Sequence, residues 1–115
     1  MRKQYLTNPY GAERLTTNIV QWGYDKGILK EVYEDLHELQ LAQAQKTYEE
    51  VVEMSDAILL HDREEVMDAI GDIIVTLIMQ AELWDTNIFE CLEGAYDVIS
   101  KRTGKMVDGQ FVKDS

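Results

Sequence analysis

The sequence predicts an all-α protein, a four-helix bundle that ends in a short hairpin-like tail. The chain has one proline, Pro9, and seven glycines among 115 residues, and long stretches free of both favour helices. Hydrophobic residues make up 45% of the chain and charged residues 29%, which is typical of a folded globular protein. At this length we expect a single domain that spans residues 1–115.

Two helices are predicted in the first half of the chain. The first follows Thr16 or Thr17 and is broken by Gly23 and Gly27, because glycine disfavours the helix interior. The second runs from about Leu29 to Leu60, where apolar residues recur at helical spacing. These residues are Leu41, Ala44, Tyr48, Val51 and Ile58.

The third helix has a capping pattern at its start. Asp62 is the predicted N-cap, and Glu65, three positions later, is placed to bond back to it. From Val66 to Ala81 the helix is apolar almost all round, and such a helix is enclosed on most sides. In so short a chain, we expect a second subunit to supply part of that cover, in a homodimer or a homotetramer.

The fourth helix is predicted from about Ile88 to Arg102, with Asn87 as its cap. Its spacing predicts a buried face formed by Ile88, Leu92, Ala95 and Ile99. Beyond it, Asp108 and Gly109 stand between alternating residues, a pattern that predicts a hairpin.

The net charge and the cysteine content limit the classes of partner and the cellular location that we expect for the chain. A net charge of −11 repels polymeric nucleic acid, which usually meets basic patches, but it admits a small polyanion bridged by metal cations. The start, Met1–Tyr5, lacks the apolar stretch of a signal peptide. The longest apolar run, Ile73–Met79, is far short of the roughly 20 residues that cross a bilayer. The single cysteine, Cys91, forms no internal disulfide and is expected to pack within a helix. We therefore expect a cytoplasmic protein without a membrane partner.

Polar residues form stripes on the second and third helices, because residues three or four apart share a helical face. The stripes comprise Gln43, Lys46, Glu50 and Glu53, then Glu65, Asp68 and Asp72. Most acidic stripes are solvated surface. If the two helices are antiparallel about a turn near His61, however, Glu50 lies level with Asp72, and carboxylates about 6 Å apart repel by roughly 1–3 kcal/mol. Mg²⁺, or Mn²⁺ in its place, relieves such repulsion through oxygen ligands, so this register favours a metal site.

The two acidic motifs resemble those of the MazG-like nucleotide pyrophosphohydrolases. Glu49–Glu53 is similar to the family's EExxE motif, and Asp68–Asp72 is similar to its second acidic motif. Gln43 and Lys46 match the Q-x-x-K that precedes EExxE in phage-type and bacterial members, and residues 101–113 resemble the tail of that branch. One position departs from the pattern: the family's second motif has an acid where this chain has Ala69.

The resemblance implies an oligomeric MazG-like helical fold that uses Mg²⁺ to release pyrophosphate from NTPs or dNTPs. By position, it assigns catalysis to Glu49, Glu50, Glu53 and Asp72. The metal ligands it implies are Glu50, Glu53 and Asp72. Either Asp68 replaces the acid missing at Ala69, which we expect, or the site has lost a ligand. A water held by Glu49 or Glu53 would attack the α-phosphorus.

Substrate contacts are expected from five residues: Gln43, Lys46, Lys101, Arg102 and Trp22. The three cations are candidates for phosphate contacts, although Lys101 and Arg102 also complement the end of a helix. Trp22 is a candidate either for stacking on a base or for the core. The base and sugar of the substrate stay open.

Two functions other than nucleotide hydrolysis are compatible with acidic residues on a helical bundle. A diiron bundle usually has two Glu-x-x-His pairs; Glu34 and His37 supply one, but Ile58 stands where His61 would need its acid. That function is therefore excluded. The remaining alternative is a non-catalytic helical oligomer, an interaction module with a degenerate metal site.

Overall fold

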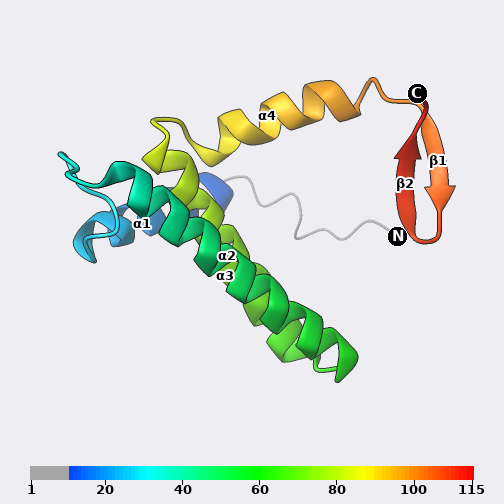
Figure 1. Ribbon diagram of the computed structural model, residues 1–115, viewed down its shortest axis with the longest axis horizontal. Helices are drawn as coiled ribbons and strands as arrows, with labels where there is room; N and C mark the ends of the chain where they lie inside the picture. Colours follow the sequence, from blue (N-terminus) through cyan, green and yellow to red (C-terminus); the bar gives the residue numbers. More distant parts are fainter. Residues whose placement is uncertain (1–10) are drawn as a thin grey trace.

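The computed structural model describes residues 11–115, a mostly helical chain with one small two-stranded sheet (Figure 1). The elements are α1 Gly11–Asp25, α2 Leu36–Leu59, α3 Arg63–Leu83, α4 Ile88–Ile99, β1 Gly104–Val107 and β2 Gln110–Lys113. The predicted helical class, with four helices and a C-terminal ribbon, is confirmed at this level. The expectations about Met1–Tyr5 and Pro9 fall outside the described residues.

The first two helices have other boundaries than predicted. α1 begins at Gly11, before Thr16, and α2 begins at Leu36 rather than Leu29. Leu29 belongs to the connection between the helices, where its backbone N–H and that of Ile28 donate to the carbonyl of Gly23. This return of the chain places the Leu29 side chain in the core, where it is 2% exposed, so an apolar residue at helical spacing is here a buried loop residue.

Gly23 does not break α1 as predicted, since it lies inside the helix. Its absent side chain leaves room for α3: a Cβ there would stand 2.5 Å from the Met79 sulfur. The break comes two residues after the helix, at Gly27, whose positive φ of 82° is easily adopted only without a side chain. Close packing, rather than helix termination, therefore accounts for the glycine at position 23.

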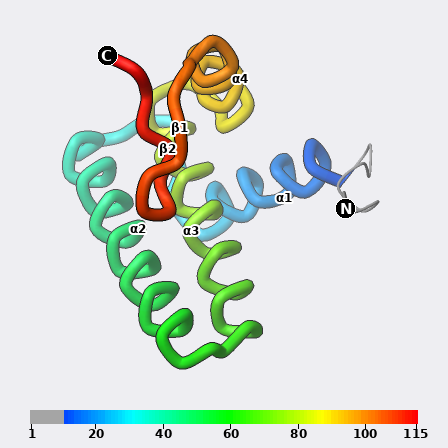
Figure 2. Tube along the Cα trace, turned by 90° about the vertical axis from the view of Figure 1, so that its right-hand side faces the viewer, coloured from blue at the N-terminus to red at the C-terminus, as the bar shows by residue number. Residues whose placement is uncertain are grey.

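α2 and α3 form a long antiparallel hairpin, which Figure 2 shows as two runs joined at one end. Asp62 caps α3 as predicted, accepting a hydrogen bond from the Glu65 backbone N–H at 3.2 Å. Across the hairpin, the Thr47 hydroxyl donates to the Thr76 hydroxyl at 2.8 Å. Thr47 lies 14 residues before His61 and Thr76 lies 15 residues after it, so the predicted register about a turn near His61 is confirmed to within one residue.

The core lies at the open end of the hairpin, away from the turn. Leu29, Ile78, Met79 and Leu83 form its buried cluster. α1 packs across α3 there, and no contact joins α1 to α2 among the described elements. Towards the turn, the hairpin consists of two helices alone, held together by small buried residues, Ala57 and Ala69.

α4 departs most from the predicted bundle. It leaves the open end of the hairpin and projects away from it, touching only α3 among the described elements (Figures 1 and 2). Of the expected buried face, Ile88 is partly buried and packs against the core. The rest of that face is exposed in the single chain, with Leu92 at 57% and Ile99 at 54%. Cys91, expected to be packed, is exposed as well, and the helix ends at Ile99 rather than Arg102. Asn87 caps α4 as predicted, accepting from the Glu90 N–H.

The C-terminal ribbon confirms the hairpin signal. β1 and β2 pair antiparallel, with Val107 opposite Gln110. Asp108 and Gly109 form the two-residue turn with positive φ values of 49° and 82°, the conformation for which Asp-Gly is preferred.

An apolar face remains open on the α2–α3 hairpin. Ala44, Tyr48, Val51 and Leu77 line a groove of about 340 Å³ between the helices. Ile70 and Ile74 extend this outer face along α3, and both are close to half exposed. Within residues 11–115, no helix combines the length and the apolar character needed to cross a membrane.

Candidate functional site

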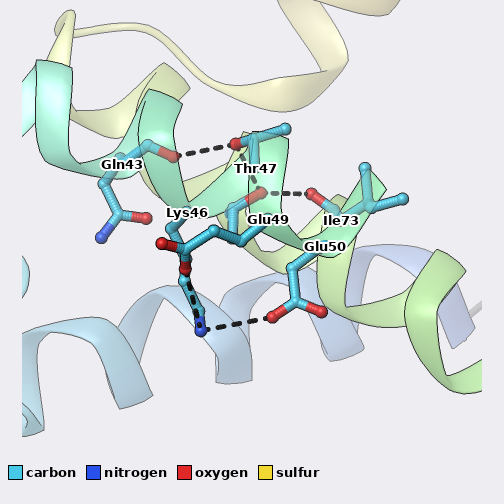
Figure 3. A network of polar contacts seen from close by, with 7 residues as sticks. Gln43, Lys46, Thr47, Glu49, Glu50 and Ile73 are labelled. Atoms are coloured by element: carbon cyan, nitrogen blue, oxygen red, sulfur yellow. Dashed lines mark hydrogen bonds and ion pairs between the residues drawn. The ribbon is translucent and has the colours of Figure 1, made fainter. Parts of the chain in front are cut away.

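The carboxylate of Glu50 is buried at the middle of the hairpin. The residue is only 6% exposed, because position 50 falls on the inward side of α2, one turn from Thr47. One carboxylate oxygen, Oε1, lies 3.4 Å from the Lys46 ammonium (Figure 3). The other, Oε2, is buried and has no hydrogen-bond partner among residues 11–115.

An ionised oxygen in that position is costly, since a buried polar atom without a partner loses its hydration and gains nothing in exchange. The neighbouring polar atoms are already paired. Thr47 donates to Thr76 or to the carbonyl of Gln43, and Thr76 lies within bonding distance of the Ile73 carbonyl (Figure 3). Neither hydroxyl bonds to Glu50, whose Oε2 stays without a partner among residues 11–115.

The charge of Glu50 helps to raise the pKa of two further carboxylates, those of Glu53 and Asp72. A hydrogen bond that a protonated Glu53 can donate to Glu50, together with the Glu50 charge, raises the pKa of Glu53. Partial burial, followed by the charges of Asp68 and Glu50, raises the pKa of Asp72. The residues predicted as metal ligands on α2 and α3 thus share one electrostatic field.

Lys46 is the cation within this field. Its ammonium lies 3.4 Å from Glu50 and 3.9 Å from Glu49, the residue one turn away on the outer side of α2. The hydrogen bond with Glu50 and the charge of Glu50 raise the pKa of Lys46. Glu49 is about half exposed, so it stands at the rim of the site rather than within it.

Ala69 occupies a buried position in the second acidic motif. It is 4% exposed and packs where α3 meets α2, so an acid there would enter the hairpin contact. Asp68 lies beside it on the exposed surface, and its charge raises the pKa of Asp72, after the larger effect of burial. Asp68 is thus linked to the cluster through Asp72, one turn away on the same face of α3.

The remaining predicted substrate residues are only partly gathered. Gln43 lies one turn from Lys46 on the same stripe and is half-buried. Trp22 is 44% exposed on α1, so it is not a core residue. Lys101 and Arg102 follow the far end of α4, which touches neither α2 nor α1 among the described elements. Within one chain, these two cations are therefore separated from the carboxylates.

The donor set fits a hard cation, but the site is not closed. No three His, Cys, Asp or Glu side chains converge into a ready cage within residues 11–115. The oxygen-only donors and the unpartnered Oε2 of Glu50 suit Mg²⁺, which commonly binds through one or two carboxylates and completes its shell with water and phosphate. The residues would hold such an ion through Glu50, with Glu53, Asp72 and Asp68 around it.

The largest hollow lies elsewhere and was not foreseen from the sequence. It is a groove of about 890 Å³ between α1 and the start of α4. Its lining includes Arg14, Tyr24, Glu82 and Phe89, and burial followed by the charge of Asp85 raises the pKa of Glu82. None of the predicted ligands lines it, and no sequence motif marks it, so its size alone does not make it the reactive site.

Comparisons with known proteins give no match. No model of a known protein family fits the chain, and neither a curated protein nor a solved structure is similar enough to count as a relative. The function is therefore inferred from the acidic motifs and from the geometry around Glu50.

The raised pKa of Asp72 predicts a pH-dependent stability. Ionisation of Asp72 is less favourable in the folded chain than in the unfolded chain, so its charge destabilises the fold above the folded pKa. Asp72→Asn should therefore raise the free energy of unfolding near neutral pH, by less than about 1 kcal/mol because the group faces water. The gain should shrink as the pH falls below about 4, where the aspartate is protonated in both states. Urea unfolding at both pH values, with Asp97→Asn on α4 as the control, measures it; a gain that grows in acid would contradict the argument.

Proposed function

We propose that this protein is a Mg²⁺-dependent nucleotide pyrophosphohydrolase that converts nucleoside triphosphates to monophosphate and pyrophosphate. The observation that carries the proposal is the buried, unpartnered Oε2 of Glu50. It lies within the motif Glu49–Glu53 and at the level of the second motif, Asp68–Asp72. A protein retains a costly buried carboxylate where a bound cation offsets the cost.

The chain's own residues supply the remaining chemistry. When bound, Mg²⁺ neutralises triphosphate charge and stabilises the charge that develops on phosphoryl oxygens. Glu53, whose pKa is raised by Glu50, is a better proton acceptor than an ordinary glutamate. It would hold a water and take its proton as the oxygen attacks the α-phosphorus. The bond from that phosphorus to the bridging oxygen breaks, and pyrophosphate leaves with the electron pair; Glu49 is the alternative base.

A homo-oligomer is part of the proposal. The exposed residues of the α2–α3 outer face, such as Tyr48, Val51 and Ile74, form a continuous apolar surface of the kind that marks a protein interface. A second copy would cover it, and a partner's Lys101 and Arg102 would offer a route for these cations to reach a carboxylate cluster that their own chain does not bring near.

The alternative function is a non-catalytic helical interaction module. The exposed faces of α4 and of the hairpin favour it, as does Ala69 in place of an acid. Both functions predict an oligomer. They differ in turnover, because only the hydrolase releases pyrophosphate.

Glu50→Gln tests the hydrolase directly. The amide cannot replace the carboxylate as a metal ligand, so pyrophosphate release from a panel of NTPs and dNTPs with Mg²⁺ should fall by at least about a hundredfold. Mg²⁺ should raise the melting temperature of the parent chain, because it binds the native state, and should lose that effect in the variant. Glu64→Gln, an exposed residue in the first turn of α3, is the charge-matched control. A parent chain that releases no pyrophosphate from any nucleotide would favour the interaction module.

Asp68→Asn tests whether Asp68 replaces the acid missing at Ala69. Asp68 and Asp72 share a face one turn apart, so together they can bracket one ion or a bridging water. We expect activity to fall by orders of magnitude with the fold intact. Glu65→Gln should cost far less, since Glu65 lies nearer the turn, where its N–H is engaged with the Asp62 cap. If Asp68→Asn turns over like the parent and binds Mg²⁺ equally well, the site works with Glu50, Glu53 and Asp72 alone.

Light scattering at micromolar concentration tests the oligomer. We expect the mass of a dimer or a tetramer, because burying apolar surface is the main driving force for association. Tyr48→Lys, which places a charge on the outer face, should shift the mass towards the 13.3 kDa of the single chain. A parent chain that is already monomeric under these conditions would refute this part of the proposal.

A further inference from the structure

The Lys46 ammonium contacts two carboxylates on one side and faces solvent on the other. It lies 3.4 Å from Glu50 Oε1 and 3.9 Å from Glu49 Oε2, and its side chain is 54% exposed. Figure 3 shows it reaching along α2 towards the Glu50 carboxylate. Both contacts are local to one helix, at spacings of four and three residues. A long, flexible side chain held only by such contacts can leave without disturbing the fold.

Lys46 is also the only lysine or arginine of α2. The same carboxylates that would hold a metal act on it: Glu50, Glu49 and Glu53 each contribute to its raised pKa. In return, its charge lowers the pKa of Glu53 and Asp72, against the effect of the surrounding acids. In this structure, one ammonium therefore serves as counter-ion for the whole cluster.

The Lys46 counter-ion pairs with only one of the two oxygens of Glu50. Lys46 pairs with Oε1 of Glu50, whereas Oε2 keeps no partner among residues 11–115. In this structure the ammonium lies at Oε1 alone. A divalent cation can bind at the carboxylate and recruit Glu53 and Asp72 as well. Two cations this close to one carboxylate repel each other, so the second one enters at the expense of the first.

We infer that Lys46 is a built-in competitor of the divalent cation, holding its place beside Glu50 until the metal displaces it. The inference rests on the proposed function, since it concerns the same metal site. Displacement releases the ammonium at the rim of the site, where a triphosphate would lie, so the residue that first neutralises the acids becomes available to the phosphates. Metal binding thereby prepares the chain for the nucleotide, and the two ligands bind in a favoured order.

The test measures Mg²⁺ alone, by calorimetric titration, without nucleotide or turnover. Lys46→Met keeps the length of the side chain and removes its charge, so we expect Mg²⁺ to bind roughly tenfold tighter. Lys46→Arg keeps the charge and should restore an affinity close to that of the parent. Lys26→Met, in the turn after α1, makes the same change in net charge away from the cluster and should alter the affinity less than twofold. A melting curve without metal checks that each variant is folded.

A second titration separates competition from a simple charge effect. With Mg²⁺ saturating, pyrophosphate should bind Lys46→Met about tenfold more weakly than the parent, because the released ammonium is missing. Tighter metal together with weaker pyrophosphate is the expected signature. Lys46→Met with unchanged or weaker Mg²⁺ affinity would overturn the inference, as would a folded parent that binds no Mg²⁺. If the signature appears but no nucleotide is hydrolysed, the competition stands and the hydrolase fails.

Discussion

The α2–α3 hairpin buries the carboxylate of Glu50 without giving both of its oxygens a hydrogen-bond partner, and the arrangement of the site depends on this. Glu50 occupies an inward position that an apolar side chain would fill without cost, and it leaves one oxygen unpartnered within residues 11–115. The Thr47–Thr76 bond one turn away fixes the level at which the two helices face each other. Because that level is fixed, the two acidic motifs lie at the same height along the hairpin, and the charge of Glu50 acts on Glu53 and Asp72.

The rest of the chain supports this hairpin at one end only. α1 and the returning loop with Leu29 close the core around Met79, while the half towards His61 remains a pair of helices. This leaves the carboxylates accessible on one side and an apolar surface exposed on another. α4 and the ribbon extend away with Lys101 and Arg102 at their junction (Figure 1). This open arrangement is the observation behind the proposed oligomer.

Local signals predicted the features that are settled by neighbours in the chain. The Asp62 and Asn87 caps, the Asp108–Gly109 turn and the hairpin register follow from short-range hydrogen bonding and helical periodicity. Features decided by distant packing were missed. Leu29 is spaced like a helix residue but packs from a loop, and Gly23 serves the contact with Met79. Periodicity predicted a buried face on α4, yet it could not say that the covering surface is absent from residues 11–115. At the site, the stripes identified the acids, but only the fold distinguishes the buried Glu50 from the exposed Glu49 and Asp68.

The central claim is that a divalent cation completes the coordination of Glu50. Crystals grown with Mn²⁺ and measured at the manganese absorption edge test it most directly, because the anomalous signal locates the ion without assumptions about activity. We expect an anomalous-difference peak for Mn²⁺ within coordination distance of Glu50 and next to Asp72. The Lys46 ammonium should have moved away from Oε1. A crystal saturated with Mn²⁺ in which Lys46 still pairs with Glu50, and the ion lies elsewhere or nowhere on the chain, would contradict it.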